Sequence, residues 1–308
     1  MKKKAPKIKK LCTVILEFNN PKMTMETIQS LRKASVPQNI QHKIIVIDNS
    51  PVPDGLLEKY LKQYPNIKYL ATLQNTGFAQ GNNIGIKLGL KAKCDYFLLL
   101  NNDVEVDPKF LLNMVKTLKK GADMVVPKIY FAKGYEYHKD KYKKSQLGKV
   151  IWYAGGQMDW DNVYSQHIGI DEVDKGQFDK ETELEFANFC CLMLKREVFD
   201  TIGLLNENYF LYWEDADFSK RAFDAGFKQI YQPQAIIWHK NSGSSGSGSK
   251  LHDYYLTRNR LLFGMKYARS RTKIALVKES LIKLFTGREG EKKGIIDYYL
   301  RRYGKGNF

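Results

Sequence analysis

Residues 97–106 read Phe-Leu-Leu-Leu-Asn-Asn-Asp-Val-Glu-Val, so that an apolar run ends abruptly at three polar side chains. The apolar run predicts a buried strand, and in open α/β sheets ligands collect beyond the carboxyl ends of the strands. Asp103, with the carboxamides of Asn101 and Asn102 beside it, suits an oxygen-preferring cation such as Mg²⁺ or Mn²⁺. Asn and Asp also dominate ordinary turns, so these ten residues on their own favour a turn.

Size and composition indicate a globular protein. The chain has 308 residues, 43% hydrophobic and 13% aromatic, which is enough to bury a large core. No apolar run reaches the roughly 18 to 20 residues that a membrane span needs, and the Lys-rich start lacks the apolar stretch of a signal peptide. We therefore expect a cytoplasmic protein. Its four cysteines have no metal spacing and are expected to be buried free thiols: Cys12, Cys94, Cys190 and Cys191.

The positive charge is concentrated at the two ends of the chain. Of the net +17, residues 1–10 carry +6 and residues 250–308 carry +10, which leaves the body nearly neutral. This distribution argues against an extended groove for nucleic acid, and no nucleic-acid partner is expected. The basic ends could touch an anionic surface, either lipid or polyanion, at the inner face of the plasma membrane. They could equally be solvated tails that improve solubility.

Apolar runs that predict strands alternate with segments of helical periodicity. Strands are expected at 11–18, 42–48, 67–71, 96–101 and 234–240, and helices after Asn20-Pro21, Asp54 and Asp107-Pro108. This alternation is typical of an α/β fold with a mostly parallel central sheet and helices on both faces.

Three of the predicted strands end in polar clusters, at 17–20, 48–50 and 101–103. Because parallel strands place their carboxyl ends at one edge, these clusters should share a crevice. Asp48 could accept a hydrogen bond from a base or ribose, or could be an ordinary turn aspartate. Residues 75–85 hold glycines that could bring backbone close to a ligand and a helix start that favours negative charge. They match neither the Walker nor the dinucleotide pattern.

In order and spacing, these segments resemble the family 2 inverting glycosyltransferases, particularly the rhamnosyltransferase-like branch. The resemblance covers about residues 11–265 and implies a GT-A fold. It also implies a nucleoside-diphosphate sugar as donor, a dTDP- or UDP-sugar, and a divalent cation, Mg²⁺ or Mn²⁺, held by Asp103. The implied reaction moves a sugar, such as rhamnose, to a glycan or lipid-linked acceptor in cell-wall or other surface polysaccharide biosynthesis.

The resemblance implies a set of donor-binding residues: Glu17, Asn19, Asp48, Asn75, Gly77, Asn83, Asn101, Asn102 and Arg258. Two positions depart from the family pattern. Asn101 stands where the first acid of a D-x-D motif is expected, so only Asp103 can be an ionised ligand. Glu17 stands where a small polar residue is more common, and could read a ribose hydroxyl or alter donor choice.

Residues 209–218 place three carboxylates after an aromatic run, at the start of a predicted helix. The helix dipole favours acids there, so the cluster could serve only the helix start. Inverting transfer needs a carboxylate that takes the proton of the acceptor hydroxyl, and an apolar setting raises its pKa. The segment resembles the family's E-D motif, which implies Asp215 as general base with Glu214 as its neighbour. Asp217 and Arg221 are expected to lie either on the surface of this helix or in a supporting position behind the catalytic carboxylates.

His239 ends the last predicted strand. A lone histidine after an apolar run is usually structural. Here the resemblance favours His239 as a second ligand of the cation, beside Asp103. The Ser/Gly-rich segment 242–249 could be a linker or a lid over the donor. Beyond it, Arg258 and Arg260 could neutralise the diphosphate, and Arg258-Asn259 resembles a motif of the rhamnosyltransferase branch.

Aromatic residues gather in the second half of the sequence. Trp152, Tyr153, Trp160 and Tyr164 could face a sugar, although core packing is the better expectation for large aromatics. Residues 273–285 form a basic amphipathic helix that could dock on a membrane or pack on the domain.

The expected organisation is a basic tail (1–10), a GT-A domain (11–265) and a basic helical extension (266–308). Within the domain, 11–128 would bind the nucleotide sugar and 129–265 the acceptor. Two alternatives remain at this stage: a non-catalytic carbohydrate-binding relative, and a polyanion-binding protein that acts through its basic ends.

Overall fold

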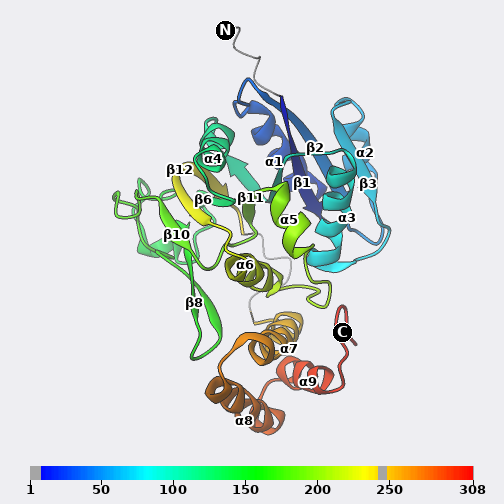
Figure 1. Cartoon of the computed structure of the whole chain (residues 1–308), viewed down its shortest axis with the longest axis vertical. Helices are drawn as coiled ribbons and strands as arrows, with labels where there is room; N and C mark the ends of the chain where they lie inside the picture. Colours follow the sequence, from blue (N-terminus) through cyan, green and yellow to red (C-terminus); the bar gives the residue numbers. More distant parts are fainter. Residues whose placement is uncertain (1–7, 242–247, 308) are drawn as a thin grey trace.

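The computed structural model describes residues 8–241 and 248–307, so most of the Ser/Gly-rich segment 242–249, expected as a linker or a lid, and most of the basic tail lie outside the described residues. Its centre is a ten-stranded sheet (Figure 1). The strands are β1 (Lys9–Glu17), β2 (Ile40–Asp48), β3 (Ile67–Ala71), β4 (Tyr96–Asn101), β5 (Val104–Val106), β6 (Met124–Phe131), β7 (Ile151–Tyr153), β10 (Thr182–Leu184), β11 (Cys191–Lys195) and β12 (Gln229–His239). Their order is β10-β12-β6-β11-β4-β1-β2-β3, with β5 on β12 and β7 on β6. A separate hairpin joins β8 (Gly156–Asp159) to β9 (Tyr164–His167).

Helices cover both faces of this sheet, and a helical group follows it. The helices are α1 (Pro21–Lys33), α2 (Leu56–Leu61), α3 (Gly77–Lys91), α4 (Phe110–Lys119), α5 (Arg196–Ile202), α6 (Glu214–Asp224), α7 (Lys250–Tyr267), α8 (Ser270–Thr286) and α9 (Glu289–Tyr299). In Figure 1, α7, α8 and α9 lie together below the sheet, next to α6. The predicted α/β class with a C-terminal helical extension is confirmed.

The strand register brings the polar clusters to one edge. β1 runs parallel to β2 and β4, with Glu17 opposite Asp48 and Leu16 opposite Asn101. The predicted shared edge is therefore confirmed. β1 begins two residues earlier than predicted, because the Lys9 N–H donates to the Asn39 carbonyl at 3.0 Å and extends the ladder.

The predicted start of α1 is confirmed, whereas α2 is shorter than expected. The Asn20 side chain accepts a hydrogen bond from the Met23 N–H at 3.3 Å, and Pro21 occupies the first helical turn. α2 ends at Leu61, so Tyr64 lies outside the helix on which it was predicted. Pro65 follows Tyr64, and a residue before proline disfavours the helical conformation.

Glycines in α3 serve packing against β1. A Cβ on Gly81 would lie 2.5 Å from Leu16 Cδ1, and one on Gly85 would lie 2.4 Å from Val14 Cγ1. Side chains there would push the helix off the sheet. The expectation that these two glycines bring backbone close to a ligand is therefore wrong.

The four cysteines are buried free thiols, as predicted. Among the helices of the described residues, none is long and apolar enough to cross a membrane.

Candidate active site

The sheet edge brings Asp103 and His239 together. β12 pairs with β5 so that His239 lies opposite Val104, the residue after Asp103. His239 Nε2 lies 3.1 Å from Asp103 Oδ1, and the two side chains are only 6% and 10% exposed. Burial lowers the pKa of His239, but the charges and hydrogen bonds of Asp103 and Cys190 together outweigh burial and raise that pKa well above its usual value.

The pair fits a divalent cation in donor type and spacing. Neighbouring ligands of an octahedral ion, each at about 2.1 Å, lie about 3 Å apart, close to the distance between Asp103 Oδ1 and His239 Nε2. A carboxylate oxygen and an imidazole nitrogen together suit Mn²⁺ and similar ions. The described residues contain no group of three His, Cys, Asp or Glu side chains that could hold a metal. Asp103 and His239 are thus the two ligands that the described part of the chain would offer at this point.

Glu17 holds the turn at the end of β1. It is 1% exposed, and its carboxylate accepts hydrogen bonds from the Asn20 N–H at 2.5 Å, from Asn102 Nδ2 at 2.8 Å and from the Thr24 hydroxyl. Burial raises the pKa of Glu17. Both oxygens are used inside the protein, so the structure does not bring Glu17 to a ribose. It fixes Asn102, the residue before Asp103.

The backbone around Asp103 is held from two sides. The Thr27 hydroxyl donates to the Asn102 carbonyl at 2.8 Å, and the Lys240 N–H donates to the Asp103 carbonyl at 2.9 Å. The N–H of Asn101, which is half-buried, donates to the Cys190 carbonyl at 2.9 Å. These bonds explain why a carboxylate can stay fixed at this point.

Asp48 lies at the same edge and is 4% exposed. It accepts hydrogen bonds from the Ser50 N–H at 3.0 Å and the Tyr69 hydroxyl at 2.7 Å. Each carboxylate oxygen can accept a further bond. Asn19 is exposed beside it, and its N–H donates to Ser50 Oγ at 2.9 Å.

Asn49 joins the second polar cluster to the start of α3, a role that the sequence did not reveal. Its Oδ1 accepts from the Thr76 N–H at 3.0 Å, and its Nδ2 donates to the Gly77 carbonyl at 3.2 Å. Asn75 Oδ1 accepts from the Gly77 N–H at 3.0 Å. Gly77 has φ +82°, and a Cβ there would lie 2.4 Å from the Phe210 carbonyl. Gly77 is thus required for close packing with the loop before α6.

Two predicted donor-binding residues lie elsewhere. Asn83 is 1% exposed and bonds the loop after α5, donating to the Leu205 carbonyl and to Glu207 Oε1, both at 2.9 Å. Arg258 is fully buried, and its guanidinium donates to Asn259 Oδ1, the Tyr254 hydroxyl and the carbonyls of Arg302 and Asn208. Arg258 therefore does not lie on a diphosphate in this structure, because its donors hold the C-terminal helices together. Arg260 likewise bonds the Asn162 carbonyl and Glu279.

Glu214 and Asp215 open α6 directly after a strained turn. Tyr212 has φ 67° and Trp213 has φ 76°, a left-handed conformation that costs a non-glycine residue about 1–3 kcal/mol. The Asn259 side chain donates to the carbonyls of Leu211 and Tyr212 and holds this turn. Strain of this kind is concentrated at functional sites.

The two carboxylates have different surroundings. Glu214 is 6% exposed, its Oε2 has no hydrogen-bond partner among the described residues, and burial raises its pKa well above the usual range. Asp215 is half-buried and accepts a bond from the Ala216 N–H at 2.8 Å. Burial raises the pKa of Asp215 to about 6, against the opposing effect of backbone hydrogen bonds. Asp215 is the more exposed of the two carboxylates, and it therefore has the accessibility that a base needs.

A series of ring contacts, here called the ring wall (Trp152, His167 and His239), leads from the Asp103–His239 pair toward the Glu214–Asp215 pair. The Trp152 ring lies 4.6 Å from the His239 ring and 4.5 Å from that of His167. His167 Nε2 contacts Asn188 Nδ2 at 3.2 Å, and a backbone bond from the next residue, Phe189, reaches Asp215. Burial lowers the pKa of His167 to about 4, so this ring is neutral. His167 and Asn188 were missed because each is an isolated polar residue in the sequence.

The four predicted aromatics divide between core and surface. Trp152 and Tyr153 are buried, as expected for aromatic residues that pack in the core, whereas Tyr164 is 46% exposed. Trp160 is half-buried and stacks on Phe263 of α7.

Asp217 anchors α6. It is fully buried and accepts hydrogen bonds from Arg221 Nε at 2.8 Å, Lys266 Nζ at 2.9 Å and the Tyr267 hydroxyl at 2.8 Å. The expected supporting role of Asp217 and Arg221 agrees with these contacts.

A separate cavity of about 810 Å³ is lined by Lys128, Tyr130, Asp174 and Trp238. Neighbouring residues of a strand face opposite sides of the sheet, so Trp238 points away from the side that His239 faces. This cavity is therefore distinct from the edge that holds Asp103.

Similarity to solved structures shows the fold of this chain. The crystal structure of GalNAc-T7 with UDP, GalNAc and Mn²⁺ matches with a TM-score of 0.62 at 16% identity, over 97% of this chain and 59% of that one. S. aureus TarS matches with a TM-score of 0.53 at 14% identity, over 91% of this chain and 44% of that one. This chain thus spans about half the length of those solved chains. The fold is that of the GT-A glycosyltransferases.

The family follows from the sequence comparison. The family model described as glycosyl transferase family 2 matches residues 12–203, and the chain belongs to this family. N-acetylglucosaminyl-diphospho-decaprenol L-rhamnosyltransferase of Mycobacterium tuberculosis is 24% identical over 68% of this chain and 70% of its own length. The low-salt glycan biosynthesis hexosyltransferase Agl10 of Haloferax volcanii is 24% identical over 58% of this chain and 53% of its own. The protein is a glycosyltransferase, as the resemblance implied.

Proposed function

We propose that this enzyme moves a sugar from a nucleoside-diphosphate sugar to a glycan or lipid-linked acceptor with inversion at the anomeric carbon. The observation that carries the proposal is one sheet edge that holds the Asp103–His239 pair, joined by a ring wall to the accessible Asp215. The named substrate of the Mycobacterium tuberculosis relative makes rhamnose the first sugar to test, with dTDP- and UDP-sugars as donors. A lipid-linked acceptor would place the reaction at the cytoplasmic face of a membrane, in surface polysaccharide synthesis.

The donor would lie along the edge between Asp48 and Asp103. Asp48 would accept a hydrogen bond from the base or ribose with the lone pairs that Ser50 and Tyr69 leave free. Asp103 and His239 would hold Mg²⁺ or Mn²⁺, which when bound supplies positive charge that stabilises the departing diphosphate. His239 would bind in its neutral form, with its proton released.

Asp215 would act as the general base. Its carboxylate would take the proton of the acceptor hydroxyl while that oxygen attacks the anomeric carbon from the face opposite the leaving group. Burial raises the pKa of Glu214 well above its usual value, and in its protonated form Glu214 would donate a hydrogen bond to the acceptor or to Asp215. Trp152 and its neighbouring rings would exclude water from the space between donor and base.

A thermal-unfolding screen of nucleotide sugars with and without Mn²⁺ tests the donor site. A ligand at 100 times its Kd stabilises the folded state by about 2.7 kcal/mol. We expect one donor to raise the Tm only with Mn²⁺, and Asp103→Asn and His239→Gln to lose that increase. His138→Gln, which changes an exposed histidine, is the matched control. If donor with Mn²⁺ raised the Tm of Asp103→Asn as much as that of the wild type, the proposed cation site would be contradicted.

Release of nucleoside diphosphate separates the proposal from its two rivals. A non-catalytic carbohydrate-binding relative would bind saccharide without releasing nucleoside diphosphate from any donor. A protein that acts through its basic ends would bind anionic polymers and show no donor binding at all.

A further inference from the structure

The outer face of α8 carries exposed apolar side chains. Ile274 is 59% exposed, Leu281 51%, Ile282 61% and Phe285 83%. At about 100° per residue, these four positions fall within an arc of roughly 100° on the helix. Their spacing makes them one contiguous stripe that faces away from the protein.

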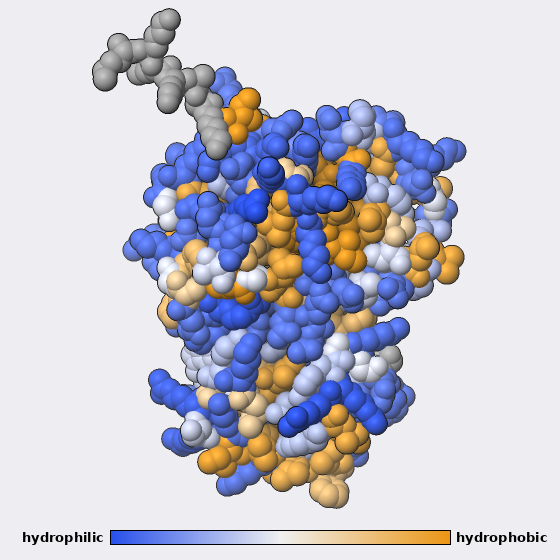
Figure 2. All heavy atoms as spheres, turned by 45° about the vertical axis from the view of Figure 1, so that its right-hand side comes forward, coloured by the Kyte–Doolittle hydropathy of each residue, from blue (hydrophilic) through white to orange (hydrophobic). Residues whose placement is uncertain are grey.

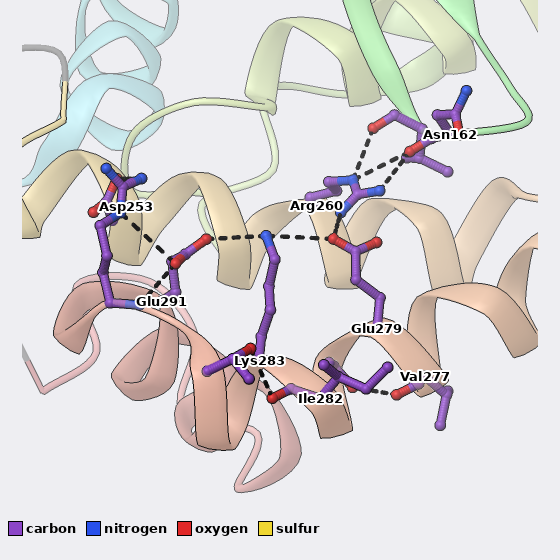
Figure 3. A network of polar contacts seen from close by, with 12 residues as sticks. Asn162, Asp253, Arg260, Val277, Glu279, Ile282, Lys283 and Glu291 are labelled. Carbon is purple, nitrogen blue, oxygen red and sulfur yellow. Dashed lines mark hydrogen bonds and ion pairs between the residues drawn. The ribbon is translucent and has the colours of Figure 1, made fainter.

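The inner face of α8 is fixed by packing and by ion pairs, so the helix cannot turn to bury this stripe. Leu276 is buried in the same cluster as Ile295 of α9. Figure 3 shows the polar network along that side, in which Arg260 Nη1 bonds Glu279 Oε1 at 2.8 Å and Lys283 Nζ bonds Glu291 Oε1 at 2.9 Å. The apolar stripe is thus the solvent-exposed outer face of a helix whose inner face is packed against the protein.

α9 also carries exposed apolar side chains. Ile296, Tyr299 and Leu300 are 46%, 45% and 54% exposed and follow helical spacing. In Figure 2, hydrophobic residues gather at the lower end of the molecule, where Figure 1 places these helices, with hydrophilic residues around them. Exposed apolar patches rimmed by polar residues mark interaction sites.

The charge that accompanies this surface is positive. Arg271 and Lys278 are exposed and fall within the arc of the stripe, and Lys293 is exposed on α9. The acids of residues 270–307 are all engaged by basic side chains: Glu279 with Arg260, Glu289 with Lys250, Glu291 with Lys283 and Asp297 with Arg302. Residues 270–307 therefore carry a net positive charge.

From these observations we infer that the outer faces of α8 and α9 dock on an anionic lipid surface. A helix that places apolar side chains and Lys or Arg toward the same side suits a bilayer interface, where the chains enter the acyl boundary and the cations meet headgroup phosphates. A second copy fits less well, because a symmetric contact would bring Arg271 and Lys278 of both copies together. This inference rests on the proposed function, in which the acceptor can be lipid-linked, and it adds an anionic lipid surface as a partner of the enzyme.

Vesicle flotation of the full-length protein tests the inference. We expect binding to vesicles of equal parts phosphatidylcholine and phosphatidylglycerol, weaker binding to pure phosphatidylcholine, and loss of binding with rising salt. Ile282→Gln/Phe285→Gln should weaken binding by about tenfold or more. Arg271→Glu/Lys278→Glu should remove the preference for phosphatidylglycerol. The control is Val52→Gln/Leu56→Gln, which changes residues 85% and 58% exposed on the donor-binding half.

Three results would overturn the inference. These are no binding of wild type to anionic vesicles, equal binding of the Ile282→Gln/Phe285→Gln variant, or a dimer that this variant abolishes while vesicle binding is unchanged. Circular dichroism checks that each variant is folded. Nucleoside-diphosphate release in vesicle-free buffer is measured alongside. Wild type that releases nucleoside diphosphate but does not bind anionic vesicles would defeat this inference alone. Wild type that binds the vesicles but releases no nucleoside diphosphate would defeat the proposed function alone.

Discussion

The side-chain amide of Asn259 donates a 3.0 Å hydrogen bond to the carbonyl oxygen of Tyr212. Tyr212 and Trp213 both have positive φ, and the next residue is Glu214, the first of α6. A second bond, from Asn259 to the Leu211 carbonyl at 2.9 Å, fixes the other side of the same turn. The C-terminal helix α7 therefore holds the backbone that presents the two carboxylates.

Replacing Asn259 by Ala should lower kcat more than it lowers donor affinity. Without the two hydrogen bonds, the strained turn would relax and move Asp215, and a misplacement of about 1 Å can cost about 10²-fold in rate. We expect a loss of about tenfold to a hundredfold in kcat with the donor Kd unchanged.

Asn83→Ala is the matched control for that measurement. Asn83 is also buried and also clamps backbone, but at Leu205, away from the turn. Both variants should lose a similar amount of Tm, and only Asn259→Ala should lose rate. Equal loss of rate in both variants would reduce Asn259 to a purely structural role.

The sequence predicted the site best where local patterns decide it. Strand ends that stop at Glu17, Asp48 and Asn101 could be placed at one edge, because the side of a parallel sheet follows from chain direction alone. The Asp103–His239 pair came from the resemblance and not from spacing, since its residues are far apart in sequence.

The sequence failed where a side chain is used by a distant partner. Asn83 and Arg258 look like ligand-binding residues in their motifs, yet their bonds go to Glu207 and to Arg302, which no local pattern indicates. Glu17 was expected to meet a ribose, but Thr24 and Asn102 use its carboxylate. Only three-dimensional contact distinguishes a binding side chain from a buried structural one.

Activity should rise with pH through about 6. Burial raises the pKa of Asp215 to about 6, and a general base works only when ionised. Lowering pH through that value protonates the base, so kcat/KM should fall about tenfold per pH unit below it.

Glu214→Gln separates the two carboxylates in the same measurement. Because burial raises the pKa of Glu214 well above its usual value, we expect this variant to keep the midpoint of the profile while lowering its plateau. A wild-type profile that is flat between about pH 5 and 8 would argue against Asp215 as the titrating base.

Arg258→Met should destabilise the protein without weakening donor binding. Its guanidinium is fully buried, bonds four acceptors and lies 5.0 Å from the ring centre of Tyr255, so its loss leaves buried groups unpaired. We expect the free energy of unfolding to fall by about 2–4 kcal/mol. Arg271→Met, at an exposed position, should change neither quantity. A large loss of donor affinity in a folded Arg258→Met protein would restore the diphosphate role.

The transfer rate of Asp215→Asn, measured at saturating donor and Mn²⁺, tests the proposed mechanism most directly. Asparagine keeps the shape of the side chain and cannot take a proton, so the rate should fall by about 10²–10⁴-fold. Donor affinity, set at the Asp48–Asp103 edge, should remain that of the wild type. A variant that binds donor normally and transfers sugar at the wild-type rate would contradict the assignment of Asp215 as the base.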